Sequence, residues 1–346
     1  MFVRDCWYVI AWEHEIPADG LFARRVLGEP IVVFRTENGI AALEDRCCHR
    51  AAPLSRGRKE GNSVRCGYHG LKFDADGRCV EIPGQTAPPP PQARVRSYPV
   101  ALHRKWVFVW MGEPARADRA MLPDNYSNEH SDWRYLPGYM HYDSDYLLIC
   151  DNLLDFSHLS YVHEKTLGGS LAIARSQADI EPVMEAGQRG LRVTRRVADV
   201  PPPPYYRKLR QFVGNVDRWF IYDFLLPGTL LMRSGGRPVG AAEDDMRGAV
   251  QLHSCQTLTP ETETSTHYFF QQSHSAELED AVFTQDIYDN LILAFNEDRD
   301  MITAQKHNIA LRPDGPMLAI VADAALIQFR RLLQRAVEAE RALAAV

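Results

Sequence analysis

The sequence predicts an α+β protein of two domains, an all-β N-terminal domain and a C-terminal domain of longer strands and helices. Three observations support this prediction. Short runs of β-branched and aromatic residues recur in the first third of the chain. The composition changes after Met111-Gly112-Glu113-Pro114, where charged and helix-forming residues begin to alternate with longer apolar runs. Near the end, apolar residues recur at helical spacing.

The N-terminal third contains several candidate strands separated by turn residues. Asn38-Gly39 and Asp76-Gly77 are typical turn pairs. Many short strands in one domain favour an antiparallel sandwich or a small barrel. The expected strands span residues 6–12, 30–35, 39–43, 95–100 and 106–110.

We place the domain boundary near residue 116, which gives an N-terminal domain of residues 1–115 and a C-terminal domain of residues 116–346. Two helices are expected near the end of the chain. The first spans 287–305 and has an apolar stripe formed by Ile287, Leu291, Ala294, Phe295 and Ile302. The second is an amphipathic helix over 325–344 with an Arg/Glu outer face, packed on the surface or against a partner subunit.

Composition and charge narrow the class of protein. A chain of 346 residues is long enough for two domains that each bury a core. The formal net charge of −6 argues against a general nucleic-acid binder, which needs a basic surface. No apolar run approaches the roughly 20 residues that span a bilayer, and the first residues lack the apolar stretch of a secretory signal. We therefore expect a cytoplasmic protein that binds neither nucleic acid nor membrane.

Two short motifs place cysteines beside histidines at fixed spacing. Cys47 and His49 form C-x-H, and after sixteen intervening residues Cys66 and His69 form C-x-x-H. A Rieske [2Fe–2S] centre needs two thiolates on one iron and two imidazoles on the other, with each loop supplying one ligand to each iron. The alternative is a structural Zn²⁺ site, but zinc fingers usually group two cysteines and then two histidines. The paired order therefore predicts a Rieske cluster.

The remaining cysteines are not expected to bind metal. The C-x-H spacing selects Cys47 as the ligand, so we expect Cys48 to pack beside the loop. The other four are scattered in a long chain that resembles no disulfide framework. Each is expected to be a small buried hydrophobe. These four are Cys6, Cys79, Cys150 and Cys255.

A second group of candidate ligands lies in the C-terminal domain. The segment from Asp151 to Glu164 follows the pattern N-x-x-D-x-x-H-x₄-H. Two histidines and one carboxylate on one face of Fe(II) leave positions open for O₂ and substrate. His158 and His163 are the candidate imidazoles. Five residues apart on an ideal helix, they would diverge by about 140°, so the helix is expected to bend or end between them.

The carboxylate of this site is expected on the helix over 287–305. Asp298 projects within about 60° of Leu291 and Ile302, on the apolar face. Glu297 and Asp300 are rotated toward solvent. A charged carboxylate on a core-facing stripe is costly unless a cation pairs with it, and Fe(II) would supply that cation. A buried salt bridge is the alternative explanation for Asp298.

These motifs resemble those of the Rieske non-haem iron oxygenases, and the likeness extends along nearly the whole chain. It is nearest to the demethylating and methyl-hydroxylating oxygenase components, as in vanillate O-demethylase and toluenesulfonate methyl-monooxygenase. Besides the two metal motifs, it includes Cys6-Trp7-Tyr8-Val9, Ile82-Pro83-Gly84-Gln85 and Thr259–Thr264. A proline is common in this family where Cys48 stands, which is a minor departure.

The resemblance implies a fold, cofactors and partners. The expected fold is a Rieske domain followed by a helix-grip domain, in which a curved antiparallel sheet holds substrate against a long helix. The expected cofactors are a [2Fe–2S] cluster and mononuclear Fe(II). The expected assembly is a homotrimer in which electrons cross between subunits. Asp155 would link His69 of a neighbouring subunit to His158, and its alternative role is to orient the iron-bound imidazole. Asn152 would lie near the iron.

The implied activity is monooxygenation of a methyl or methoxy group on a small aromatic acid, by O-demethylation or methyl hydroxylation. Electrons would come from NAD(P)H through a separate flavin- and iron–sulfur-containing reductase. Ring cis-dihydroxylation is the enzymatic alternative, because the same metals support it, and a pure electron carrier is the non-enzymatic one. Arg233, His253 and Gln256 are candidate polar contacts to substrate, or ordinary surface and core residues.

Overall fold

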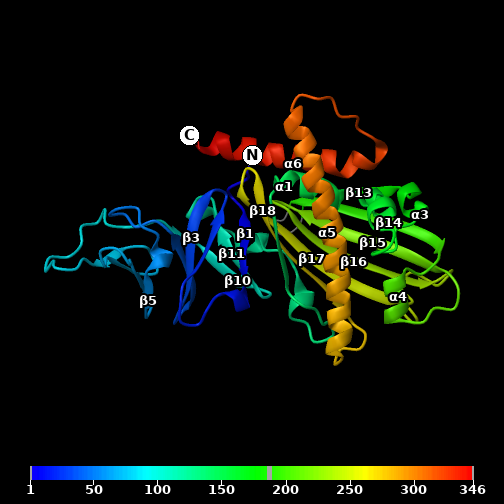
Figure 1. The fold of residues 1–346 in the computed structure, drawn as a ribbon, viewed down its shortest axis with the longest axis horizontal. Coiled ribbons are helices and arrows are strands. Elements are labelled where there is room, and N and C mark those ends of the chain that lie inside the picture. Colours follow the sequence, from blue (N-terminus) through cyan, green and yellow to red (C-terminus); the bar gives the residue numbers. More distant parts are fainter. Residues whose placement is uncertain (1, 185–188, 345–346) are drawn as a thin grey trace. The chain divides into compact units, whose positions relative to one another are not determined.

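The computed structural model describes residues 2–184 and 189–344, and these form two compact units (Figure 1). One unit comprises Met1–Leu122 with Thr259–Glu263, and the other comprises Pro123–Leu258 with Thr264–Val346. The boundary expected from the sequence follows residue 115. No local feature of the sequence predicts that residues 259–263 join the first unit. There the carbonyls of Pro260 and Glu261 accept hydrogen bonds from the backbone N–H groups of Leu27 and Gly28, at 2.8 and 2.7 Å.

The first unit is all β apart from short 3₁₀ turns, within the residues that the structure describes, as the sequence predicts. Its strands form three small sheets with the orders β1-β11-β10, β2-β3-β4-β9 and β5-β6-β7-β8. The strands span β1 Trp7–Trp12, β2 Phe22–Val26, β3 Glu29–Thr36, β4 Gly39–Glu44, β5 Arg58–Glu60, β6 Ser63–Arg65, β7 Lys72–Phe73, β8 Cys79–Glu81, β9 Ser97–Tyr98, β10 Val100–His103 and β11 Trp106–Trp110.

The core of the first sheet is aromatic. Every residue of β1 and β11 is buried, and the two strands pair antiparallel. Because both faces of these strands are covered, their sequences are continuous apolar runs instead of alternating ones. Trp12 packs on Trp106 with ring centroids 5.6 Å apart, and Trp7 packs on Trp110 at 5.3 Å. The two Cys/His loops follow β4 and β6, which belong to the other two sheets of this unit.

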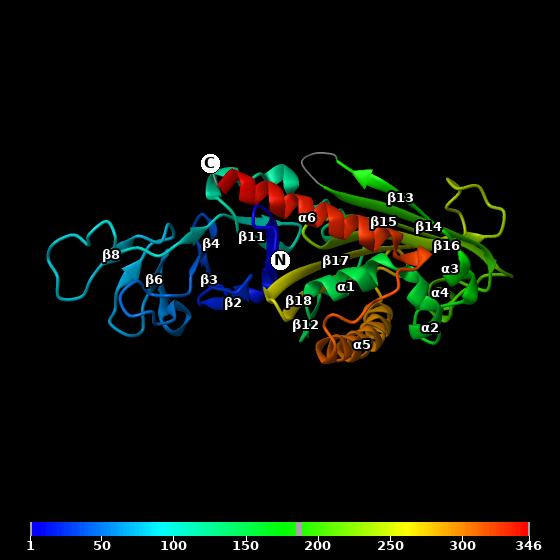
Figure 2. The ribbon, with the colours of Figure 1, turned by 90° about the horizontal axis from the view of Figure 1, so that it is seen from above.

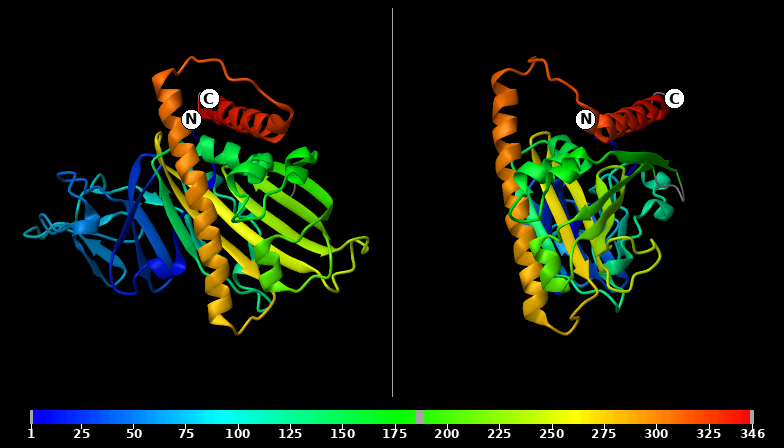
Figure 3. Two further views of the ribbon diagram at one scale, coloured as in Figure 1. Left: turned by 45° about the vertical axis from the view of Figure 1, so that its right-hand side comes forward. Right: turned by 90° about the vertical axis from the view of Figure 1, so that its right-hand side faces the viewer.

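The second unit is built on a seven-stranded antiparallel sheet with the order β12-β18-β17-β16-β15-β14-β13 (Figure 3). Its helices cross one face of the sheet, and α1, α2 and α4 lie on the same side as α5 (Figure 2). This arrangement confirms the predicted α+β class. The strands are β12 Gly138–Tyr142, β13 Ala178–Val183, β14 Gly190–Val200, β15 Val216–Leu225, β16 Thr229–Pro238, β17 Val250–Thr262 and β18 Ser265–His274. The helices are α1 Tyr146–Leu154, α2 Leu159–Val162, α3 Leu171–Arg175, α4 Pro204–Leu209, α5 Ala281–Leu311 and α6 Ala324–Ala344.

The long helix α5 begins at a side-chain cap and buries one stripe. The Asp280 carboxylate accepts hydrogen bonds from the N–H groups of Val282 and Phe283, which would otherwise lack partners at the helix start. The stripe predicted from the sequence is confirmed, since all five of its residues are buried. Together with them, Thr284 and Asp298 are also buried.

Helix α6 packs on its own unit through a narrow apolar face. Phe329 is fully buried and meets Phe224 of β15 edge-on, with ring centroids 4.7 Å apart. Next to Phe329 along the helix, the guanidinium of Arg330 is hydrogen-bonded to the carboxylate of Asp151 on α1. Among the described helices, none is long and apolar enough to cross a membrane.

Candidate functional site

Two tight loops in the first unit bring the four Cys/His residues together. One follows β4 and the other follows β6. Each loop closes on its cysteine, because the N–H of Ala51 donates to the Cys47 carbonyl at 2.9 Å and the N–H of Gly70 donates to the Cys66 carbonyl at 3.1 Å. Both cysteines are buried. The histidines His49 and His69 are exposed, with ring centroids 4.6 Å apart.

Glycines allow the two loops to approach each other. A Cβ atom on Gly67 would lie 2.7 Å from the Arg56 carbonyl oxygen, and one on Gly57 would lie 1.9 Å from the Arg65 carbonyl oxygen. Gly70 has a φ of +76°, a left-handed conformation that favours glycine, and so the chain can turn back directly after His69.

The four side chains fit a [2Fe–2S] cluster with two kinds of ligand. The two thiols are buried in the unit and the two imidazoles are exposed at its surface. This separation matches a cluster in which one iron is bound by sulfur and the other by nitrogen. Burial raises the pKa of the Cys47 thiol to about 11. Because a metal binds the thiolate, this buried sulfur needs a positive charge beside it, and iron would provide one.

The structure corrects one expectation about the cysteines. Cys48 is exposed and does not pack beside the loop. It lies between Cys47 and His49 on a tight turn, where it is exposed to solvent. The other four cysteines, Cys6, Cys79, Cys150 and Cys255, are buried as predicted.

The second candidate centre lies in the second unit, where the helix breaks between two histidines. Helix α1 ends at Leu154, a 3₁₀ turn covers Phe156–His158, and α2 ends at Val162, so His163 is the residue that caps it. The expected break in the helix is therefore confirmed. It turns the His158 and His163 rings toward each other, with centroids 5.2 Å apart.

Helix α5 supplies a carboxylate between these two rings. Asp298 Oδ1 lies 3.0 Å from His163 Nε2 and 3.5 Å from His158 Nε2. One potential ligand atom from each residue lies within 4.8 Å of the other two, and Asp298 is only 5% exposed. Two imidazoles and one carboxylate converging in this way form the donor set typical of non-haem Fe(II) sites. We call His158, His163 and Asp298 the triad.

Neighbouring side chains hold the triad in place. Asn152 donates a hydrogen bond from Nδ2 to Asp298 Oδ1 at 2.9 Å. Glu297 Oε2 lies 2.8 Å from His163 Nδ1 and accepts a hydrogen bond from Thr166 Oγ1 at 2.7 Å. A proton on His163 Nδ1 leaves Nε2 free for a metal.

This role of Glu297 was not predicted from the sequence. Helix geometry correctly puts Asp300 in solvent, but Glu297 is half-buried and contacts His163. The angle of Glu297 on a helical projection places it toward solvent. A glutamate side chain at the edge of the apolar face is nevertheless long enough to reach inward, and its length is the feature of the sequence that could have indicated this contact.

Burial and the nearby carboxylates act differently on the two imidazoles. Burial lowers the pKa of His158, which favours the neutral form that binds metal. Burial also acts to lower the pKa of His163, but hydrogen bonds to Asp298 and Glu297 outweigh it and raise the pKa overall. The carboxylates thus create a site for a positive charge at His163.

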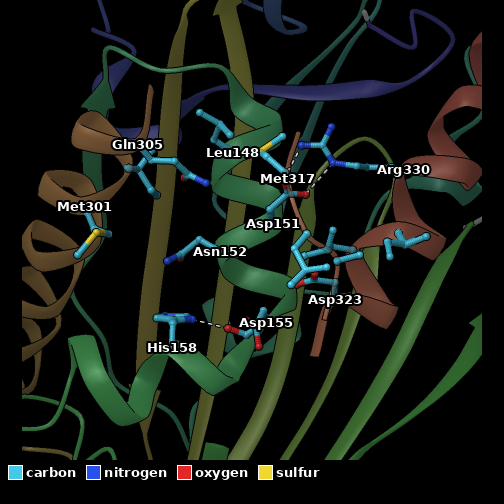
Figure 4. A pocket seen from close by; sticks show the side chains of 15 residues that line it. Leu148, Asp151, Asn152, Asp155, His158, Met301, Gln305, Met317, Asp323 and Arg330 are labelled. Atoms are coloured by element: carbon cyan, nitrogen blue, oxygen red, sulfur yellow. Dashed lines mark hydrogen bonds and ion pairs between the residues drawn. The ribbon is translucent and has the colours of Figure 1, made fainter. Parts of the chain in front are cut away.

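Asp155 contacts His158 through its backbone. The Asp155 carbonyl oxygen is the atom beside His158 Nδ1. Its carboxylate accepts hydrogen bonds from Ser157, at 2.8 Å from N–H and 2.9 Å from Oγ. This half-buried carboxylate lines a cavity of about 520 Å³ with Asn152 and His158 (Figure 4).

A second cavity is lined by residues of the sheet and of the helices, and it shares Asn152 and His158 with the first. Apolar side chains form much of its wall, and all three triad residues line it. Of the three polar contacts suggested by the sequence, Gln256 lines this cavity. His253 instead packs on Trp133, with ring centroids 4.0 Å apart, and Arg233 is exposed. Beyond the triad, the polar lining consists of Asn152, Tyr205, Arg218, Ser234, Gln256 and Gln272.

Comparison with known proteins relates both units to described families. Residues 6–99 match the Rieske [2Fe-2S] domain, and residues 142–339 match the vanillate O-demethylase oxygenase C-terminal domain. The chain is 45% identical to the toluene-4-sulfonate monooxygenase system iron-sulfur subunit of Comamonas testosteroni, over 98% of both chains. It is 34% identical to a vanillate O-demethylase oxygenase subunit of a Pseudomonas species, over 92% of this chain and 97% of that protein.

Solved structures agree with these matches. Dicamba monooxygenase bound to 3,6-dichlorosalicylic acid superposes with a TM-score of 0.88 at 29% identity, covering 100% of this chain and 99% of that one. Another structure of dicamba monooxygenase, with non-heme iron and dicamba, matches with a TM-score of 0.76 at 27% identity over 99% of each chain.

Proposed function

This chain belongs to the Rieske oxygenases whose C-terminal domain is that of vanillate O-demethylase oxygenase subunits, and we propose that it hydroxylates a methyl or methoxy substituent of a small aromatic acid. One observation carries the proposal: a His/His/Asp triad forms part of the wall of a largely apolar cavity. A pure electron carrier needs no such cavity.

We propose that the cluster ligands are Cys47, His49, Cys66 and His69, and that the triad holds a mononuclear iron. The support is the donor chemistry at each place and the non-haem iron named for dicamba monooxygenase. Iron bound by the triad would supply the activation of O₂. Asn152 would keep the Asp298 carboxylate in place, and Glu297 would keep the proton of His163 on Nδ1.

The cavity would hold the substrate ring and exclude water from the reacting carbon. Phe156, Phe220 and Phe295 supply apolar surface that suits an aromatic ring. The position of the ring decides the product, because the carbon held nearest the metal is the one that reacts. Hydroxylation at a methoxy carbon gives a phenol and formaldehyde, and hydroxylation at a ring methyl gives an alcohol.

We further propose a homotrimer in which Asp155 links two subunits. Its carboxylate binds Ser157 but retains lone pairs, and it lines the cavity of about 520 Å³ beside His158. This position would let it accept a hydrogen bond from His69 of the partner subunit. Asp155 would then hold the two metal sites at a fixed separation.

A relative named as an oxygenase subunit implies a separate reductase, and this chain works with one as well. We propose that this reductase contains flavin and an iron–sulfur cluster and draws electrons from NAD(P)H.

The test is product analysis with defined acids. The iron-loaded enzyme, a reductase and NADH are incubated with 4-methylbenzenesulfonate, 4-methylbenzoate and methoxybenzoates. We expect a benzylic alcohol from a methyl acid or formaldehyde from a methoxy acid, with matching O₂ uptake. A cis-dihydrodiol as the main product from the best substrate would establish ring dihydroxylation instead.

A further inference from the structure

The cavity that contains the triad also contains a buried arginine. Arg218 lies on β15 and is only 2% exposed. It lines the cavity beside Phe220, two residues along the same strand face. The triad comes from the helix side of the cavity, whereas Arg218 comes from the sheet.

Contacts on several sides hold the guanidinium of Arg218. Its Nη1 donates to the Gly168 carbonyl at 3.0 Å, and its Nη2 lies 3.5 Å from the Tyr205 hydroxyl. The group lies over the rings of Tyr206 and Phe220, 5.2 and 5.0 Å from their centroids.

A glycine on the next strand makes room for this arrangement. Gly236 pairs with Arg218 across β15 and β16. A Cβ atom at Gly236 would lie 2.6 Å from the Tyr206 ring, so a larger residue would displace the ring that supports the guanidinium. The position of Arg218 is therefore determined by several elements at once.

No negative charge balances this cation within the part of the chain that the structure describes. Among the residues that the structure describes, no carboxylate forms an ion pair with Arg218, and its Nε–H has no hydrogen-bond partner. Arginine has five N–H donors and stays charged in proteins. The polar contacts with Gly168 and Tyr205 leave donors unused on a group shielded from water.

Two other buried arginines lie on the same sheet. Arg195 donates from Nη1 to the carbonyls of Ile173 and Ser176 and to the Ser176 hydroxyl. Arg237 pairs with Glu243, although its Nε–H, like that of Arg218, has no hydrogen-bond partner among the described residues. Neither lines the cavity. Arg195, like Arg218, forms no ion pair with a described carboxylate, so what distinguishes Arg218 from the other two is its place in the wall of the triad's cavity.

A buried charge without a counter-ion is unfavourable, and it is usually paired or placed to bind a ligand of opposite charge. We propose that Arg218, with Tyr205, binds the carboxylate or sulfonate of the substrate. This inference rests on the proposed function and adds the residue that selects for an acid. An anion held on the sheet side leaves the rest of the ring to extend toward the triad.

The test measures binding of an acid and of its neutral amide. Anaerobic, iron-loaded wild type and Arg218→Gln are titrated by calorimetry with 4-methylbenzenesulfonate, 4-methylbenzoate and 4-methylbenzamide. We expect the wild type to bind at least one acid more tightly than the amide. Arg218→Gln should bind that acid at least about 30-fold more weakly, the effect typical of removing one partner of a buried charge pair. Binding of the amide should change by less than about threefold, because it carries no charge for Arg218 to neutralise.

Control variants separate binding from stability. Arg195→Gln removes a buried arginine that does not line the cavity, so its affinity for the acid should match the wild type. If Arg218→Gln does not fold, as judged by circular dichroism and cluster absorbance, Arg218→Lys decides. Lysine keeps the charge but loses the planar fork, so acid binding should weaken while amide binding stays the same.

Unchanged acid affinity in a folded Arg218 variant would overturn this role, as would an equal loss for acid and amide. A wild-type enzyme that binds no acid more tightly than the amide would overturn it as well. If the wild type hydroxylates no acid at all, the proposed function fails, whatever the variants bind. The two acids distinguish a planar carboxylate from a sulfonate as the preferred anion.

Discussion

Replacing Glu297 by alanine should weaken iron binding although Glu297 is not proposed as a ligand. The substitution removes the oxygen that lies 2.8 Å from His163 Nδ1 and 2.7 Å from Thr166 Oγ1. His163 is 1% exposed, so water has little access to take the place of the carboxylate. The imidazole then loses the group that orients it and keeps its proton on Nδ1.

The expected magnitude follows from this geometry. A hydrogen bond to a charged group contributes about 1.5–3 kcal/mol. The Glu297 side chain is 35% exposed, so solvent screens its charge and the lower part of that range applies. A loss of about 1.5–2 kcal/mol corresponds to a roughly 10- to 30-fold higher Kd for Fe(II).

The assay is an anaerobic Fe(II) titration in competition with a chelator, on enzyme whose cluster is intact. Glu297→Gln keeps an oxygen acceptor without the charge and should lie between alanine and the wild type. Asp300→Ala is the matched control, because Asp300 is an exposed acid on the same helix. Cluster absorbance should be the same in all variants.

Two results would refute this reasoning. An Fe(II) Kd for Glu297→Ala within threefold of the wild type would show that the contact with His163 does not support the metal. An equal loss in Asp300→Ala would show that the effect is one of overall charge, not of orientation.

Four further predictions concern the two candidate metal centres and the start of α5. Asp298→Ala should abolish turnover and mononuclear iron while the cluster spectrum stays intact; full activity would exclude it as a ligand. Cys66→Ser should remove the reduced-cluster EPR signal, whose average g value is otherwise below that of all-cysteine clusters, and an unchanged signal would contradict the assignment. Asp155→Asn should keep both metals and the oligomer, yet its cluster should not be oxidised when substrate and O₂ are added in a single turnover; normal oxidation would remove the linking role. Asp280→Ala should lower the free energy of unfolding by about 0.5–2 kcal/mol in urea, because the α5 cap is lost, and an unchanged value would show that the cap adds no stability.

Local spacing in the sequence was enough to identify the candidate metal ligands. Cys47 and His49 lie on one short loop, and loop geometry is set by neighbours in the chain, so a motif can be read directly. The apolar stripe of α5 likewise separated Asp298 from Asp300, because helical periodicity determines which face a residue occupies. The fold class followed from the same periodicities.

Contacts between distant segments were decided only by the tertiary structure. Nothing local to Asp298 indicates that it meets His163, and the reach of Glu297 to the same ring depends on how α5 lies against the segment after α1. The exposure of Cys48 is decided by how its turn is oriented on the surface of the unit.

Alternation along β15 shows that Arg218 and Phe220 share a face, but both faces of a strand can be covered. Which face meets the cavity, and whether a carboxylate lies near Arg218, depends on strands and helices far away in the chain. The packing of separate helices and strands determines which side chains meet at the site, and the local conformational propensity of each residue does not.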